Sequence, residues 1–216
     1  LLDRGHQVGA FDGALMSTVP LSAGMSSSAA LEIATCFALK EAFSIDLPNE
    51  DWARIGQKVE NEYLGLNSGL LDQFSSIFGK ADNLILCDFR EVKVLKNVAI
   101  PHGYGFVIAN SMVKHNLVES DYNERRERCE RAVSTIHSRP PEVKALRDVS
   151  MSMLEGCKDI LDATDYKRAK HVVGEDERVK QAEAALADGD VGRLGQLLFE
   201  SHQSSIDYFE NSCPEL

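Results

Sequence analysis

A proline, a glycine and three consecutive serines lie close together at residues 20–30, which read PLSAGMSSSAA. The apolar run at residues 14–19 before them has the length and composition of a short β-strand. After them, apolar residues recur at helical spacing as far as about Phe43, namely Ala30, Ile33, Ala34, Phe37 and Ala38. The pattern therefore predicts a strand, a tight turn and a helix in succession, and the rest of the fold must accommodate this unit.

The predicted turn has the properties of a phosphate-binding loop. The first turn of a helix leaves backbone N–H groups unpaired, and the helix dipole places partial positive charge there. Gly24 lets the chain turn tightly and lets a ligand approach the backbone, while Ser26, Ser27 and Ser28 add small hydroxyl groups. The Walker sequence is absent, because no lysine stands beside the serines. A simpler alternative is that Ser26 or Ser27 only caps the helix.

Two acidic residues further along the chain are candidates for chemistry. Asp72 lies in the first turn of another predicted helix, which opens just after Gly69 and ends near residue 78. A carboxylate there can accept or orient the proton of a hydroxyl group, or it can simply complement the helix dipole. Glu60 lies on the preceding predicted helix, and taken alone it is best interpreted as an exposed acid.

A third segment, residues 110–130, is polar and rich in charge and reads NSMVKHNLVESDYNERRERCE. Lys114 and His115 could contribute solvated charge alone, and the run at 123–128 is typical of the solvated face of a helix.

The composition excludes several classes of function. A formal net charge of −11 argues against a nucleic-acid partner, which usually requires a basic patch. The five cysteines are widely separated and form no C-x-x-C pair, which indicates reduced thiols in a cytoplasmic protein rather than disulfides or a zinc site. No apolar run reaches the length of a membrane span, so we expect no membrane partner.

Taken together, these segments resemble the motifs of one family of small-molecule kinases. Residues 20–30 are similar to P-x-x-x-G-L-S-S-S-A, the second motif of the GHMP kinases, with Met25 in place of the leucine. Residues 68–73 are similar to S-G-(I/L)-(M/L)-D-Q, and residues 110–130 to N-S-x-(V)-(K/R)-H-x-L-x-x-S-x-Y-N-x-R-R-x-x-C-E, both from the galactokinase branch. Three later segments extend the resemblance over nearly the whole chain: 168–175, 200–205 and 212–216.

The resemblance implies a site for each reactant. For ATP it implies a loop made of Pro20, Gly24, Met25, Ser26, Ser27, Ser28 and Ala29. For Mg²⁺ it implies Ser28 and Glu60 as ligands, with Ser27 as the alternative to Ser28. For the sugar it implies Gly69, Asp72 and Tyr122, with Asp72 as the catalytic residue beside the anomeric hydroxyl group and with Lys114 and His115 shaping the site.

The activity that the resemblance implies is the ATP-dependent phosphorylation of galactose to α-D-galactose 1-phosphate. The nearest alternative is a kinase of another hexose, such as N-acetylgalactosamine or a uronic acid, because the sugar contacts of the first family motif are out of view. Another alternative is a non-catalytic sugar sensor, which the intact serines of residues 26–28 disfavour. The expected partners are therefore a sugar and ATP. The sequence does not give the oligomeric state, and it is compatible with a monomer.

The fold that the resemblance implies is the α+β fold of the GHMP kinases. Its N-terminal domain resembles the second domain of ribosomal protein S5, and its C-terminal domain is ferredoxin-like. A boundary near Pro101 gives domains at residues 1–100 and 101–216. The patterns also predict a hairpin over residues 7–19 and strands at these positions: 83–89, 92–100 and 105–109.

Two motifs of the family are missing from the printed sequence. The first would precede residue 1, and the third, a glycine-rich motif, would follow residue 216. We therefore expect the chain to be a fragment of a longer protein, with both domains truncated, that does not turn over substrate by itself.

Overall fold

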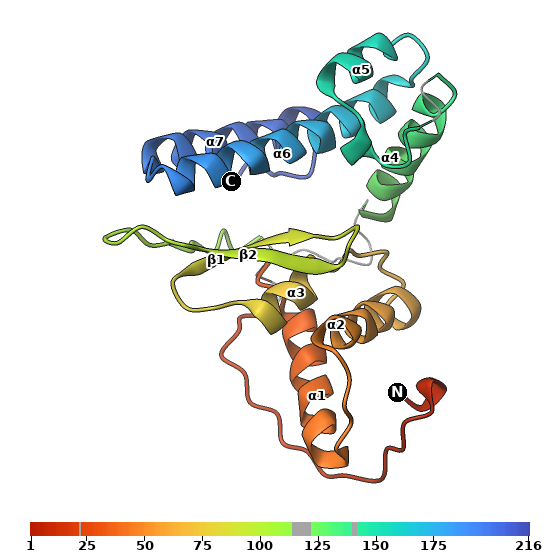
Figure 1. Ribbon diagram of the computed structural model, residues 1–216, viewed down its shortest axis with the longest axis vertical. Helices are drawn as coiled ribbons and strands as arrows, with labels where there is room; N and C mark the ends of the chain where they lie inside the picture. Colours follow the sequence, from red (N-terminus) through yellow and green to blue (C-terminus); the bar gives the residue numbers. More distant parts are fainter. Residues whose placement is uncertain (22, 114–121, 140–141) are drawn as a thin grey trace. The chain divides into compact units, whose positions relative to one another are not determined.

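The computed structural model describes residues 1–21, 23–113, 122–139 and 142–216 (Figure 1). Contacts between residues divide the chain into two compact units. Unit 1 comprises Leu1–Ile100 with Gly105–Ser120, and unit 2 comprises Pro101–Tyr104 with Asp121–Leu216. Each unit is described by itself below. None of the described helices combines the length and the apolar character needed to cross a membrane.

Unit 1 is built on three helices that pack against one another, α1 (Ser27–Phe43), α2 (Asn49–Lys58) and α3 (Leu71–Phe78) (Figure 1). The sequence predicts all three, because each has apolar residues at helical spacing. Their shared core contains side chains that are completely shielded from solvent, namely Ala29, Trp52, Ala53 and Phe74. Two short elements complete this part of the unit, the 3₁₀ turn η1 (Leu2–Arg4) and the π turn η2 (Val59–Tyr63), which continues α2.

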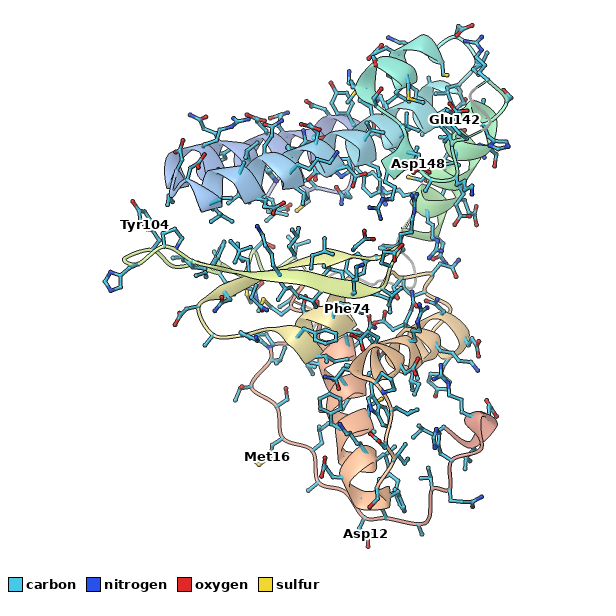
Figure 2. All side chains as sticks on the ribbon, in the orientation of Figure 1. Asp12, Met16, Phe74, Tyr104, Glu142 and Asp148 are labelled. Carbon is cyan, nitrogen blue, oxygen red and sulfur yellow. The ribbon has the colours of Figure 1, made fainter. Side chains whose placement is uncertain are left out.

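A β-hairpin lies against α3. Strands β1 (Asn83–Asp88) and β2 (Lys93–Ala99) pair antiparallel, which confirms the strands predicted at 83–89 and 92–100. Phe74 lies where α3 meets the hairpin (Figure 2), and its ring contacts the ring of Phe89 edge-to-face with centroids 5.3 Å apart. The aromatic contact anchors the hairpin to the helix that carries Asp72.

The other two predicted strands do not form. Residues 7–18 and 105–109 belong to no helix or strand, so the hairpin predicted over 7–19 and the strand predicted at 105–109 are wrong. Val8 packs against the core of unit 1, but most of the other apolar side chains are exposed, with Met16 95% and Val107 94% exposed, and Met16 points away from the helices in Figure 2. An apolar run becomes a strand only where another strand satisfies its N–H and C=O groups, and sequence alone does not supply that partner.

Helices and short helical turns are the regular secondary structure of unit 2 in its described residues. Its longer helices are α4 (Tyr122–Ile136), α6 (Ala163–Ala187) and α7 (Val191–Ser204), with α5 (Met151–Gly156) between α4 and α6. Two short turns complete it, η3 (Leu146–Asp148) and η4 (Ser205–Phe209). It therefore supplies helices and, within the described residues, no strand of the expected ferredoxin-like domain.

Buried charge ties the helices of unit 2 together. Asp165, at the start of α6, is 2% exposed and accepts hydrogen bonds from Arg131 on α4 over 2.6 and 2.7 Å. The guanidinium groups of Arg131 and Arg128 hold the pKa of Asp165 below its usual value. The core beneath these pairs is apolar and includes Ile136 and Leu154.

Candidate functional site

The serine-rich turn leads directly into α1. Gly24 has a positive φ of 68°, and Ser26 takes the left-handed conformation as well (φ 52°, ψ 39°), so two close residues turn the chain before the helix begins at Ser27. A left-handed conformation is costly for a residue with a side chain and is often found at functional sites. The Ser26 side chain accepts no capping hydrogen bond. Capping by the Ser26 side chain is therefore not the reason for a serine here.

The residues expected to bind ATP differ in how accessible they are. Pro20, Gly24 and Met25 are exposed, and the three serines are half-buried. Ala29 is completely buried in the core of unit 1, so its side chain cannot reach a ligand and only its backbone can take part. Ser22, which lies inside the motif, is outside the described residues.

Glu60 is buried, which contradicts its interpretation as an exposed acid. It is 2% exposed and lies on the π turn η2, where the helix widens after α2. The Ser28 Oγ donates a hydrogen bond of 2.9 Å to the Glu60 Oε1. The Ser68 Oγ donates to the other carboxylate oxygen, and the Ser68 carbonyl in turn accepts from the Gln57 Nε2 over 3.0 Å.

The pairing of Ser28 with Glu60 has the chemistry of a partial magnesium site. A hydroxyl and a carboxylate are oxygen ligands of the kind Mg²⁺ accepts, and Mg²⁺ commonly takes one or two protein oxygens and completes its shell with phosphate and water. Among the described residues no group of three or more acidic, histidine or cysteine side chains is arranged to hold a metal ion. Two protein ligands fit a metal that arrives with a nucleotide better than they fit a permanently held one.

Asp72 lies in the first turn of α3 and is half-buried. Its charge and that of Glu60 both act on Glu32, a residue of α1 that sequence reasoning missed. Burial raises the pKa of the Glu32 carboxyl to about 7, with smaller contributions from the charges of Glu60 and Asp72, while the hydrogen bond from Gln73 lowers it. Three carboxyl groups from α1, η2 and α3 therefore share one electrostatic environment.

Gly69 lies three residues before Asp72 and is exposed, with no atom near the position of a side chain. A ligand can therefore approach the backbone at this point, and the family resemblance implies that this ligand is a sugar.

Tyr122 is the first residue of α4, in unit 2, and is 41% exposed. Lys114 and His115 lie outside the described residues. The arginines that follow pair within the fold, since Arg125 donates to the carbonyl of Phe209 over 2.9 Å and Arg126 to Glu130 over 2.9 Å.

The positions that the sequence did not single out are Ser68 and Glu32. Ser68 stands beside Gly69, and Glu32 follows Ser28 by one helical turn on the same face, so helical spacing from Ser28 was the available signal for Glu32.

Comparison with known proteins identifies related sequences along nearly the whole chain. Residues 2–80 match the family model for the GHMP kinases N terminal domain. A galactokinase from Mannheimia succiniciproducens is 43% identical over 208 residues, covering 95% of this chain and 52% of that protein. A galactokinase from Thermotoga maritima is 40% identical over 215 residues, covering 98% of this chain and 58% of that protein. The chain thus spans about half the length of the curated relatives it matches.

A solved structure matches as well. The crystal structure of Lactococcus lactis galactokinase complexed with galactose superposes with a TM-score of 0.87 at 35% identity, over 92% of this chain and 51% of that one. With the sequence match at residues 2–80, this similarity confirms the α+β GHMP fold.

Proposed function

The chain belongs to the GHMP kinase family, and on this premise we propose that the full-length protein transfers the γ-phosphoryl group of ATP to O1 of galactose, giving α-D-galactose 1-phosphate. The observation that carries the proposal is the hydrogen bond between Ser28 and the buried Glu60, in the same electrostatic environment as Asp72. The relatives named above are galactokinases, and the one from Lactococcus lactis was crystallised with galactose.

The turn before α1 binds the phosphates of ATP in this proposal. Its backbone N–H groups and the positive end of the helix dipole attract negative oxygens, and the serine hydroxyls donate to them. Pro20, Gly24 and Met25 shape the loop, whereas Ala29 contributes through its backbone because its side chain is buried.

Ser28 and Glu60 hold the magnesium ion that accompanies ATP. When bound, Mg²⁺ neutralises phosphate charge and aligns the γ-phosphate for transfer. The hydrogen bond of 2.9 Å between the two side chains keeps both oxygen ligands together on the protein before the metal arrives.

Asp72 acts on the sugar. The O1 hydroxyl attacks the γ-phosphorus, a new P–O bond forms, the bond between that phosphorus and the bridging oxygen breaks, and ADP leaves. Asp72 either accepts the O1 proton as a base or orients the hydroxyl group by hydrogen bonding. Gly69 and Tyr122 contact the sugar in this proposal, and the chain is divided into domains at residues 1–100 and 101–216.

A reducing compartment suits the protein, since all five cysteines are free thiols and two of them, Cys36 and Cys157, are buried. We therefore place it in the cytoplasm.

The test is a coupled assay of ADP release with a panel of sugars, using the full-length protein. We expect galactose to give the highest kcat/KM. If N-acetylgalactosamine or a uronic acid gives the highest kcat/KM, that sugar is the substrate instead of galactose. Binding of galactose and ATP without ADP release would identify a sugar sensor and contradict the kinase proposal.

A further inference from the structure

Helices α1, α2 and α3 contact one another about one helical turn away from the proposed metal ligands Ser28 and Glu60. Glu32 follows Ser28 by four residues on α1, and Gly56 of α2 precedes Glu60 of η2 by four residues. Four residues are about one turn of helix, so along the helix axis Glu32 lies roughly 5–6 Å from Ser28, and Gly56 lies roughly the same distance from Glu60. The third contributor is Gln73, the neighbour of Asp72 on α3.

Glu32 and Gln73 are joined by a hydrogen bond. The Gln73 Nε2 donates to the Glu32 Oε2 over 3.1 Å, although 41 residues separate them. Gln73 is completely buried, and its Oε1 has no hydrogen-bond partner among the described atoms. The bond to Glu32 is therefore the contact that fixes its amide, because a buried amide gains nothing from solvent.

Gly56 provides the space for this pair. A Cβ atom at position 56 would lie 3.1 Å from the Gln73 Cγ and 3.2 Å from the Glu32 Oε2. Both contacts are closer than ordinary van der Waals distance, so a side chain at position 56 would push Glu32 and Gln73 away by a few tenths of an ångström. Three helices thus converge on one hydrogen bond.

We infer that Glu32 and Gln73 are positioning residues for the phosphoryl-transfer site. Their hydrogen bond fixes the first turn of α3, and with it Asp72, against the helix that begins at the serine turn. The inference rests on the proposed function, since it concerns the alignment of Asp72 with the phosphates bound at that turn. Neither Glu32 nor Gln73 touches a substrate in this account.

The size of the effect follows from how sharply phosphoryl transfer depends on geometry. A displacement of about 1 Å at a reacting group can lower a rate by roughly 10²-fold. Loss of the bond therefore lowers kcat by about 10- to 100-fold, while the KM values for ATP and sugar change by less than about threefold, because the binding groups remain.

The experiment compares Glu32→Leu with Glu32→Gln in the full-length protein. Leucine cannot accept from the Gln73 amide. Glutamine can accept from it and can also donate to the buried Gln73 Oε1, so we expect Glu32→Gln to retain a kcat within about threefold of the wild type. Gln73→Leu should lower kcat as much as Glu32→Leu does, and the double variant should be no slower than either single variant, because one shared bond has been removed.

The matched control is Glu41→Leu, an exposed acid near the end of the same helix, which should leave kcat unchanged. An unchanged kcat in Glu32→Leu, equal losses in Glu32→Leu and Glu32→Gln, or additive losses in the double variant would each overturn the inference. If Glu32→Leu does not fold, Gln73→Leu is compared with Glu32→Gln instead, because leucine at position 73 removes the amide donor whereas Glu32→Gln keeps the bond. A wild-type protein that phosphorylates no sugar would contradict the proposed function instead.

Discussion

The Ser28 hydroxyl donates a hydrogen bond of 2.9 Å to the Glu60 carboxylate, although 32 residues separate the two in sequence. The bond joins the first turn of α1 to the π turn η2 that follows α2. It brings one hydroxyl and one buried carboxylate to the end of a helix whose dipole attracts anions. A metal–phosphate site needs both features in one place.

Replacing both proposed metal ligands should raise the magnesium requirement of the full-length enzyme. Loss of a residue that merely orients a ligand costs about 10- to 100-fold in metal affinity, so Ser28→Ala with Glu60→Gln should shift the Mg²⁺ concentration for half-maximal rate at least about tenfold. The measurement is a Mg²⁺ titration of ADP release at saturating sugar. The control is the double variant Ser76→Ala with Glu41→Gln, which changes two exposed sites on α3 and α1. An unchanged Mg²⁺ titration in Ser28→Ala with Glu60→Gln would refute the proposal that these two residues bind the metal.

Phe74 packs α3 against the hairpin, and its loss should lower the free energy of unfolding. Phe74 is completely buried and contacts the rings of Phe78 and Phe89. Phe74→Ala should lower the free energy of unfolding by about 3–5 kcal/mol, because it removes buried apolar area and leaves a cavity. Urea unfolding measures this, with Leu71→Ala on the exposed face of the same helix expected to cost less than about 1 kcal/mol. Equal losses in the two variants would contradict the packing described here.

Stability should fall as the pH rises towards 7 because of Glu32. Its pKa is raised to about 7 by burial, and the charges of Glu60 and Asp72 add to this effect, whereas an unfolded glutamate titrates near about 4.3. Between these values the folded state holds a proton that the unfolded state has lost, so this part of the stability is complete below about pH 4 and is gone above about pH 7.

Thermal unfolding of the wild type and of Glu32→Gln between pH 4 and 8 tests whether stability falls as the pH rises because of Glu32. The amide cannot lose a proton, so the melting temperature of Glu32→Gln should rise relative to the wild type as the pH increases, and the difference should level off above about pH 7. Cys36 does not change charge in this range, because burial and, to a smaller extent, the charge of Glu32 raise the pKa of its thiol to about 11. A difference that stays constant across this range would show that Glu32 is not protonated in the folded state near neutral pH.

The sequence predicts the three main helices of unit 1 and its strands β1 and β2 well, because their signals are local. Apolar residues at helical spacing define α1 and α3, and β-branched and apolar residues between turn signals define β1 and β2. Residues 14–19 and 105–109 carry the same signal as β1, yet they form no strand, because a strand depends on a partner that its own sequence does not name.

The candidate site is less visible in the sequence than the fold. The burial of Glu60 depends on the π turn at Val59–Tyr63, and no periodicity in the sequence marks that turn. The bond between Glu32 and Gln73 joins residues 41 positions apart, and it requires α2 to pass close by at Gly56. Contacts of this kind follow from helix packing, which a single sequence does not specify.

The most direct test of the account is the rate of the Asp72→Asn variant in the full-length protein. Asparagine keeps the shape of the side chain, but it can neither accept the O1 proton nor carry the negative charge of the carboxylate. The kcat with galactose should therefore fall by about 10²–10⁴-fold. The affinity for ATP should stay within about threefold, since the nucleotide binds at the serine turn. Asp82→Asn, an exposed site in the same unit, should behave as the wild type. A near-normal kcat in Asp72→Asn would remove Asp72 from the mechanism and contradict the account.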